Sequence, residues 1–239
     1  MKFNVFLINL DRSTERLQRA SEQIEAAGFT FERVPAVDGA TLTDEKIAKV
    51  FDAKAAAKRF HYDLTAGEVG CYLSHVKCWE KIIDDNLDYA VILEDDLLLD
   101  TQFASVISAI PQLKSDWHYL KLSCPFKPRP YKTTETVIGK DNLEISLVNY
   151  NKSPTGTVAQ VVSREGAKRL LAKKPPFFRP IDIDLQWSWE VDIIVQGLVP
   201  YVADVSDEPS EIQRIAQRKE LKKRPFNKLK ETIRFKLKW

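Results

Sequence analysis

Three consecutive carboxylates, Glu94, Asp95 and Asp96, interrupt an otherwise apolar stretch of the sequence, VILEDDLLLD at 91–100. The hydrophobic run at 90–93 that precedes them is typical of a strand buried on both faces in a parallel sheet. Ionised carboxylates repel one another, and burying them without a cation or hydrogen bonds costs several kcal/mol each. A strand that ends at Leu93 avoids this cost, because it delivers the acids to the carboxyl edge of the sheet, where open α/β sheets bind ligands.

The alternation of side chains along an extended chain predicts how the three acids are arranged. Glu94 and Asp96 are expected to project together, with Asp95 on the other side. Two convergent carboxylates suit a hard divalent cation such as Mn²⁺ or Mg²⁺. Acids after a strand are also found as solvated residues or as caps of the next helix, so the cluster suggests a metal or catalytic site without specifying it.

A second group of residues, Cys71, His75 and Cys78, has side chains that bind zinc and the spacing of one helical face. The same spacing is that of a buried stripe. Three ligands from one straight helix cannot easily surround a metal, so the sequence favours the stripe.

Strands and helices alternate along the first 125 residues, as a parallel sheet with connecting helices requires. The expected strands are 3–10, 30–34, 89–93, 117–122 and 158–162, with hairpin strands at 136–138 and 143–148. The expected helices are 13–27, 44–60, a helix from the capping box of Thr65 and Glu68 to about 83, 101–109, and one from Ser163 to about 173. The predicted fold is therefore α/β, a mostly parallel sheet with helices on both faces and a later antiparallel hairpin.

Size and composition are those of a soluble globular protein. The chain has 239 residues, of which 44% are hydrophobic and 29% charged, and no run approaches the ~20 apolar residues of a membrane span. The N-terminal segment MKFNVFLINLDRS is interpreted as a first strand and not as a secretory signal. Three cysteines are too few for a disulfide framework, so a cytoplasmic location is expected.

The C-terminal tail differs from the body in charge. Residues 214–239 carry 11 Lys or Arg and 2 acids, whereas the remainder has 25 basic and 32 acidic residues. Apolar residues recur in the tail at helical spacing among lysines, namely Phe226, Leu229, Ile233 and Leu237. This pattern predicts a basic amphipathic helix at an anionic membrane surface, with a solvated terminus as the alternative. Nucleic acid is not expected, because no stacking aromatics or recognition motif accompany the tail. We therefore divide the chain into a body at 1–212 and a tail at 213–239.

Five stretches in order resemble glycosyltransferase family 25, the lipopolysaccharide and lipooligosaccharide glycosyltransferases. They are VFLINLDRSTERL at 5–17, AVDG at 36–39, GEVGCYLSH at 67–75, VILEDD at 91–96 and GTVAQVVSREGAKRLL at 156–171. The similarity covers roughly residues 3–212 and departs from the expected pattern at Gln160, where an aromatic residue was expected. It implies a GT-A-like fold and an inverting transfer of sugar, often galactose from UDP-galactose, to a lipid-linked saccharide. By the same resemblance, Glu94, Asp95 and Asp96 match the family's counterpart of an Asp-x-Asp metal motif for Mn²⁺ or Mg²⁺.

Several residues are placed to bind such a donor. Asn9, Asp11 and Arg12 stand where the first strand meets its helix, a natural position for ribose or phosphate contacts. Arg12 is preferred to Arg16, which could be a surface ion-pair partner. Further donor-binding candidates are Asp38, Gly39, His75 and Lys121. Each has an ordinary alternative: a plain turn for Asp38-Gly39, a buried hydrogen-bonded histidine, and a surface lysine.

An inverting transfer also needs a general base for the acceptor hydroxyl, distinct from the metal ligands. The segment PIDIDLQWSWEVD at 180–192 offers Asp182 as the first candidate and Asp184 as the second. Asp182 could instead cap a helix that begins at Ile183. Trp187, Trp189 and Glu190 are predicted acceptor contacts, because aromatic faces stack on sugar rings and neighbouring acids bind hydroxyls.

The sequence thus predicts a cytoplasmic glycosyltransferase that associates peripherally with the inner face of the bacterial inner membrane. Two other classes remain open. One is a Mg²⁺-dependent phosphotransfer enzyme, although no phosphate-cradling glycine run accompanies the acids. The other is a non-catalytic peripheral membrane adaptor with an α/β body.

Overall fold

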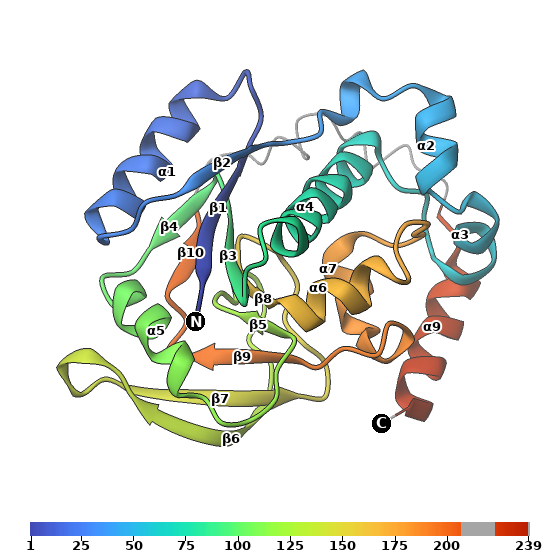
Figure 1. The fold of residues 1–239 in the computed structure, drawn as a ribbon. Helices are drawn as coiled ribbons and strands as arrows, with labels where there is room; N and C mark the ends of the chain where they lie inside the picture. The colour runs from blue at the N-terminus through green and yellow to red at the C-terminus, as the bar shows by residue number, and fades with distance from the viewer. Residues whose placement is uncertain (207–222, 239) are drawn as a thin grey trace.

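A computed structural model of the chain describes residues 1–206 and 223–238. Within these residues an eight-stranded sheet has the order β2-β1-β3-β8-β5-β9-β7-β6, and β4 and β10 form a second, two-stranded sheet (Figure 1). The strands are β1 (Phe3–Asn9), β2 (Glu32–Pro35), β3 (Tyr89–Glu94), β4 (Leu97–Leu99), β5 (Tyr119–Lys121), β6 (Tyr131–Ile138), β7 (Glu144–Tyr150), β8 (Ala159–Ser163), β9 (Val195–Val199) and β10 (Ala203–Val205). The boundary predicted at residue 212 lies outside the described residues.

Strand direction in the large sheet is mostly uniform. β1 runs parallel to both β2 and β3, and β5 runs parallel to β9. β8 is antiparallel to both β3 and β5, and β7 is antiparallel to both β9 and β6. Only β7 and β8 among the eight strands therefore run against the rest. The predicted mostly parallel sheet with a late antiparallel hairpin is confirmed.

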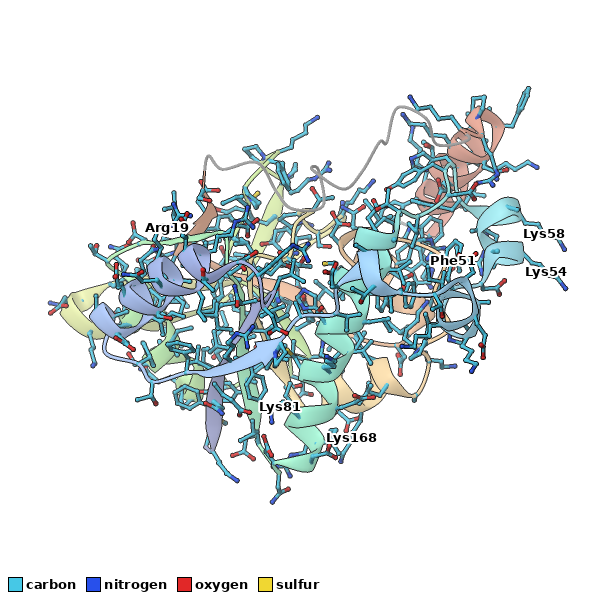
Figure 2. All side chains as sticks on the ribbon, turned by 90° about the horizontal axis from the view of Figure 1, so that it is seen from above. Arg19, Phe51, Lys54, Lys58, Lys81 and Lys168 are labelled. Atoms are coloured by element: carbon cyan, nitrogen blue, oxygen red, sulfur yellow. The ribbon has the colours of Figure 1, made fainter. Side chains whose placement is uncertain are left out.

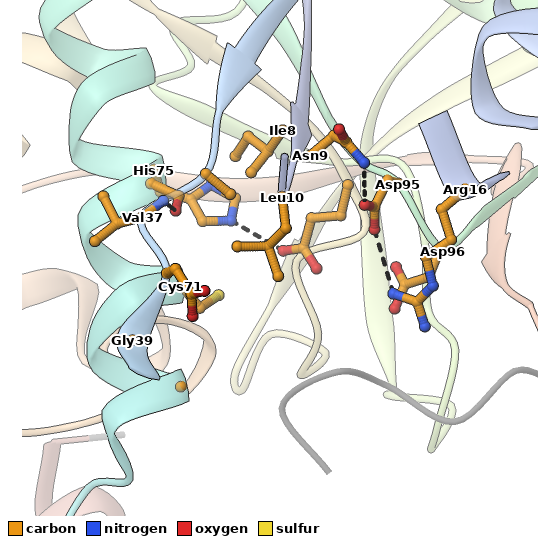
Figure 3. Close-up of a pocket in the computed structure, with 15 residues that line it drawn as sticks. Ile8, Asn9, Leu10, Arg16, Val37, Gly39, Cys71, His75, Asp95 and Asp96 are labelled. Carbon is orange, nitrogen blue, oxygen red and sulfur yellow. Dashed lines mark hydrogen bonds and ion pairs between the residues drawn. The ribbon is translucent and has the colours of Figure 1, made fainter. Parts of the chain in front are cut away.

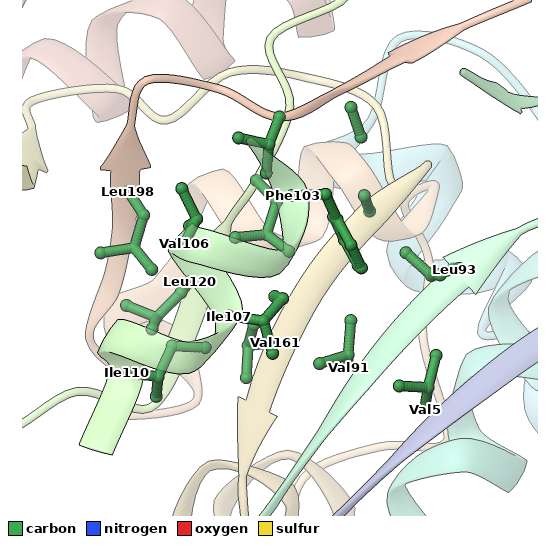
Figure 4. Close-up of a cluster of buried hydrophobic side chains, with 14 of the residues drawn as sticks. Val5, Val91, Leu93, Phe103, Val106, Ile107, Ile110, Leu120, Val161 and Leu198 are labelled. Atoms are coloured by element: carbon green, nitrogen blue, oxygen red, sulfur yellow. The ribbon is translucent and has the colours of Figure 1, made fainter. Parts of the chain in front are cut away.

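The central strands place successive side chains in two separate cores, because side chains alternate between the faces of a sheet. Val5 and Leu7 of β1 belong to one hydrophobic cluster, and Phe6 and Ile8 belong to the other. Figure 4 shows the first of these clusters, in which Val91 and Leu93 of β3 meet side chains of α5. The hydrophobic run before the acids is thus buried on both faces, as predicted.

The helices cover both faces of the sheet. α1 (Thr14–Ala26) and α5 (Phe103–Ala109) pack on the first core, whereas α4 (Ala66–Asp84), α6 (Arg164–Leu171) and α7 (Ile181–Gln186) pack on the second. α4 begins with the predicted capping box, in which Thr65 and Glu68 exchange hydrogen bonds. No described helix is both long and apolar enough to cross a membrane.

The predicted helix at 44–60 is two helices, α2 (Asp44–Val50) and α3 (Ala53–Arg59). The helix is interrupted at Phe51 and Asp52, because Phe51 makes a bridge with Phe177 and the side chain of Asp52 caps the new helix α3. Strands β4, β9 and β10 were not predicted, and β6 begins five residues before the predicted hairpin strand. Short strands with few residues on each face give too little periodicity to recognise.

The C-terminal helix α9 (Pro225–Lys238) lies beside α3 at one end of the molecule (Figures 1 and 2). Three of its residues, spaced one turn apart, contact the body. The side chain of Asn227 donates to the carbonyl of Phe60, Glu231 pairs with His61, and Phe235 packs against two tryptophans. The predicted tail helix is therefore present and docked.

Candidate active site

A cavity lies where β1 and β3 end and α4 passes beside them (Figure 3). The two strands are in register, with Ile8 opposite Glu94. The cavity is lined by Ile8, Asn9, Leu10, Arg16, Ala36, Val37, Asp38, Gly39, Gly67, Cys71, Ser74, His75, Glu94, Asp95 and Asp96. It therefore brings together seven of the predicted site residues, at the predicted edge of the sheet.

The three consecutive acids have different partners. Glu94 Oε1 lies 2.9 Å from His75 Nε2, on the α4 side of the sheet. Asp95 faces α1, where it accepts a hydrogen bond from Asn9 Nδ2 at 2.7 Å and pairs with Arg16 at 3.3 Å. The opposite directions of Glu94 and Asp95 are as predicted. Hydrogen bonds and an ion pair thus compensate two of the three charges.

Asp96 is the carboxylate whose burial is not compensated. Its Oδ1 is buried without a hydrogen-bond partner among the described residues. Burial, together with the charges of Glu94 and Asp95, raises the pKa of Asp96 to about 7. A buried oxygen acceptor without a donor, beside two further carboxylates, is the environment that a hard cation satisfies. The residues present therefore fit a divalent cation.

The pKa of Glu94 moves in the opposite direction. Burial alone would raise the pKa of this carboxyl, but the hydrogen bond and charge of His75, with help from Thr157 and Lys121, lower it overall. Glu94 is therefore held ionised next to a neighbour that takes up a proton near neutral pH. Two carboxyls whose environments separate their pKa values are typical of sites that bind cations or move protons.

The start of α1 is fixed by a network around Asn9. Its Nδ2 also donates to the carbonyl of Ser13 at 2.9 Å, and its Oδ1 accepts from Arg33 Nε at 3.0 Å. Asn9 therefore orients Asp95, and its polar atoms are occupied. The exposed Asp11 pairs with Arg33 and does not line the cavity.

The sequence favoured Arg12 as the arginine near the donor and allowed Arg16 to be a surface residue, but the structure places the two the other way round. Arg12 forms an ion pair with Asp38, and its side chain is 44% exposed. Arg16 is buried and lines the cavity. The burial of Arg16 could have been predicted from the sequence, because Arg16 shares the buried face of α1 with Ala20 and Ile24 at spacings of four residues. The preference for Arg12 was wrong as far as the cavity is concerned.

Gly39 allows the loop after β2 to touch α4. A Cβ atom at this position would lie 2.0 Å from the carbonyl oxygen of Ala66, and one at Gly70 would lie 2.4 Å from that of Val37. Only glycine permits such close backbone contact. The Asp38 side chain accepts from the backbone N–H of Ala40, so Asp38 and Gly39 form a turn whose acid faces the cavity.

Lys121 lies at the carboxyl end of β5 and is fully buried, so its interpretation as a surface lysine is wrong. Its ammonium donates to the carbonyl of Gly156. Burial lowers the pKa of Lys121 to about 8, although the charges of Asp182 and Glu94 act against this. The same Gly156 donates its N–H to Asp182 Oδ2 at 3.2 Å. Gly156 thus joins the predicted base to Lys121.

The second predicted base, Asp184, is placed differently. It is 6% exposed and forms ion pairs of 2.8 Å with Lys174 and 3.0 Å with Arg179. The hydroxyl of Tyr72 donates to it at 2.8 Å. Both carboxylate oxygens are therefore occupied inside the protein, and Asp184 serves to hold α7 against α4.

The predicted acceptor residues lie outside the cavity. Trp187 is buried beneath the guanidinium of Arg179, and Trp189 packs against Phe235 of α9. Glu190 pairs with Arg179 at 2.9 Å. These side chains connect α7 to the C-terminal helix, so their expected contact with an acceptor in this cavity is not supported.

Comparison with known proteins identifies the family. Residues 2–185 match the family model described as "Glycosyltransferase family 25 (LPS biosynthesis protein)". This chain belongs to glycosyltransferase family 25. The match includes every cavity-lining residue and Asp182, whereas α9 lies beyond it. The resemblance seen in the five sequence blocks is thereby confirmed.

Among related proteins, a glycosyltransferase 25 family member of Drosophila pseudoobscura is 31% identical over 176 residues, which are 72% of this chain and 27% of that protein. Human procollagen galactosyltransferase 2 is 29% identical over 189 residues, which are 75% of this chain and 29% of that protein. This glycosyltransferase family 25 chain spans less than a third of the length of these relatives. A Drosophila β-1,4-galactosyltransferase 7 variant, solved with manganese, UDP-Gal and xylobiose, has a TM-score of 0.46 and 12% identity, covering 90% of this chain and 74% of that one.

Two further residues of this family 25 member were not recognised as part of the site from the sequence. Cys71 lines the cavity next to His75, and burial together with the charges of Glu94, Asp182 and Asp96 raises the pKa of its thiol. Gln160 of β8 donates to His75 Nδ1 at 3.3 Å. Gln160 could be placed only once the pairing of β8 with β3 was known, since its register puts it opposite Ile92.

Proposed function

We propose that this protein transfers a sugar, most simply galactose, from a UDP-sugar to a saccharide acceptor by direct displacement with inversion. The observation that carries the proposal is the buried, uncompensated Asp96 beside Glu94 at the carboxyl edge of the sheet. The names of related galactosyltransferases support the choice of sugar.

The donor's diphosphate needs a counter-charge as the glycosidic bond breaks. Glu94 and Asp96 would hold Mn²⁺ or Mg²⁺, which when bound supplies a Lewis acid for the diphosphate oxygens. Arg16 lies on the same cavity and contributes fixed positive charge. Asp38 at the edge of the cavity offers a carboxylate to a ribose hydroxyl. These residues bind and orient the donor.

Asp182 is proposed as the general base that accepts the proton of the acceptor hydroxyl. The N–H groups of Gly156 and Ile183 donate to its two oxygens, which fixes its position at the start of α7. It lies near Lys121, because both side chains bond to the backbone of Gly156. A carboxylate that is oriented and separate from the proposed metal ligands meets the requirements of a base.

For the acceptor, we propose a lipid-linked lipopolysaccharide or lipooligosaccharide saccharide at the cytoplasmic face of the bacterial inner membrane. α9 supports this choice, because the face opposite its docking residues is apolar and exposed. Phe226, Leu229, Ile233 and Leu237 are 79%, 59%, 49% and 82% exposed. The exposed lysines of α9, with Lys54 and Lys58 on the outer side of the neighbouring α3, give this end a positive charge (Figure 2). An apolar ridge among lysines suits an anionic membrane surface.

The reaction is tested with purified protein, UDP-galactose and Mn²⁺ by measuring UDP release with and without a saccharide acceptor. We expect release that depends on the metal and is lost in Glu94→Ala and Asp96→Ala, with circular dichroism showing retained folding. Asp192→Asn is the matched control, because Asp192 is exposed, does not line the cavity, and has a positive φ that asparagine tolerates. An active Asp96→Ala variant would contradict the proposal. Phosphate transfer would indicate a phosphotransfer enzyme, and absence of any UDP-sugar turnover a non-catalytic adaptor.

A further inference from the structure

Cys71, His75 and Glu94 form a cluster that the sequence did not predict. One ligand atom from each residue, a sulfur, a ring nitrogen and a carboxylate oxygen, lies within 4.8 Å of the other two. Cys71 and His75 are one turn apart on α4, and Glu94 reaches them from the end of β3. Figure 3 shows both helix residues facing the strand ends.

This arrangement removes the objection to a metal on α4. Three ligands from one helix cannot surround an ion, but two from a helix and one from a strand approach it from different directions. Cys78, the third residue of the helical stripe, is fully buried in the hydrophobic cluster that includes Trp79 and Ile82. The stripe therefore ends in the core at Cys78, while Cys71 and His75 face the cavity.

Gln160 completes the surroundings of His75. Its Nε2 lies 3.3 Å from His75 Nδ1, and its Oε1 is buried without a partner among the residues described. With Nε2 of His75 donating to Glu94, Nδ1 accepts from the amide of Gln160. If Nε2 binds a metal instead, Nδ1 carries the proton, and rotation of the Gln160 amide offers it Oε1. One side chain thus supports both tautomers, as residues behind metal-binding histidines do.

We propose that Cys71, His75 and Glu94 bind a transition-metal ion of the Zn²⁺ or Co²⁺ type, with Gln160 orienting His75. Thiolate and imidazole ligands favour such ions over Mg²⁺. All three ligands line the cavity, so a position remains for water or a donor phosphate oxygen, as in catalytic sites. The role of this open position in donor binding rests on the proposed function, because Glu94 is also one of the ligands proposed there for the cation.

The experiment is a Co²⁺ titration of the chelator-treated full-length protein, followed by visible and near-ultraviolet absorption. We expect a thiolate-to-cobalt charge-transfer band that disappears in Cys71→Ser. Affinity for Co²⁺ should fall about tenfold or more in His75→Ala and in Gln160→Leu. Cys124→Ser is the matched control, since this partly exposed thiol does not line the cavity. Cobalt binding without the charge-transfer band, or equal affinity in Cys71→Ser, would overturn the proposal.

A measurement on the unaltered protein guards against misfolded variants. Zn²⁺ should protect Cys71, but not Cys124, from alkylation, as read by mass spectrometry of the labelled peptides. Equal labelling of Cys71 with and without Zn²⁺ also counts against the site. These results are separate from turnover: a charge-transfer band in a protein that releases no UDP would retain the metal site and reject the proposed reaction.

Discussion

Arg179 Nη1 lies 3.0 Å from Asp184 Oδ1, and both side chains are almost completely buried. The pair connects the segment before α7 to α7 itself, and Lys174 adds a second cation to the same carboxylate. Two residues earlier in the chain, Asp182 accepts only backbone N–H groups among the hydrogen bonds described for it. The contacts of these two aspartates of the same short helix therefore differ, and they support a structural role for Asp184 and the proposed catalytic role for Asp182.

The structural role predicts a loss of stability in Asp184→Asn. Removing this charge leaves the buried ammonium of Lys174 without its carboxylate, while Arg179 keeps its pair with Glu190. Breaking a buried ion pair in this way should lower the free energy of unfolding by about 3 kcal/mol. Urea denaturation measures the change. The control Asp192→Asn breaks an exposed pair with Arg169 and should cost less than about 1 kcal/mol. Equal effects of the two substitutions would be evidence against the structural role.

For Asp182→Asn we expect the converse, a folded protein that transfers poorly. The amide can still accept from one backbone N–H, but it cannot take a proton from the acceptor. General-base catalysis is worth roughly 10²–10⁴-fold, so the transfer rate should fall by that factor. Calorimetry should show UDP binding in Mn²⁺ within about threefold of the unaltered protein, since the base acts on the acceptor. Transfer at nearly the original rate would assign the base to another residue.

Lys121 predicts how stability depends on pH. The unfolded side chain has a pKa near 10.5, whereas burial lowers the folded value to about 8. Between these values the unfolded chain binds the extra proton, so the Lys121 contribution to the free energy of unfolding rises with pH. Below about pH 8 both states are protonated, and the cost of burying the charge is constant.

The comparison of wild type with Lys121→Met isolates this effect. From about pH 7.5 to about pH 10.5, the difference in unfolding free energy should shift in favour of wild type by roughly 2–4 kcal/mol. Urea denaturation at several pH values gives the difference directly. The exposed Lys132→Met should show none of this shift. A difference for Lys121→Met that stays constant over the range would mean that the lysine is not buried as described.

The edge of the sheet could be predicted from the sequence because the signal is local. The run at 90–93 is hydrophobic at every position, so its strand and the place of Glu94 follow without knowledge of other elements. The capping box of Thr65 and Glu68 is equally local. In contrast, the roles of Asp182 and Asp184 depend on partners that are far away in sequence or on other elements, such as Tyr72 and Gly156.

The same dependence on distant partners explains why the sequence did not reveal the positions of Trp187 and Trp189. An aromatic residue beside acids has the composition of a sugar-binding surface, but Trp187 and Trp189 are covered by Phe235, nearly fifty residues later. The apolar spacing of the tail correctly predicted a helix, yet it did not reveal that Asn227, Glu231 and Phe235 form a second, docking face. Long-range packing decides such cases, and no pattern within one segment encodes it.

The two faces of α9 make the membrane prediction testable. Leu229, Ile233 and Leu237 point away from the docking face, so replacing all three with serine should leave the fold intact. Each buried aliphatic side chain contributes about 1.5–3 kcal/mol when fully removed from water, so even partial insertion makes the triple variant bind at least about tenfold more weakly. Sedimentation with vesicles that contain anionic lipid measures this affinity.

The matched control replaces Leu98 and Ile138, two exposed aliphatic residues of the body, with serine. These changes remove exposed apolar surface away from α9 and should leave vesicle binding unchanged. Binding of the unaltered protein should also weaken as salt rises, because the lysines of α9 and α3 supply part of the attraction. If the triple serine variant sediments with vesicles as well as wild type does, the apolar face of α9 is not a membrane contact, and a lipid-linked acceptor loses its structural support.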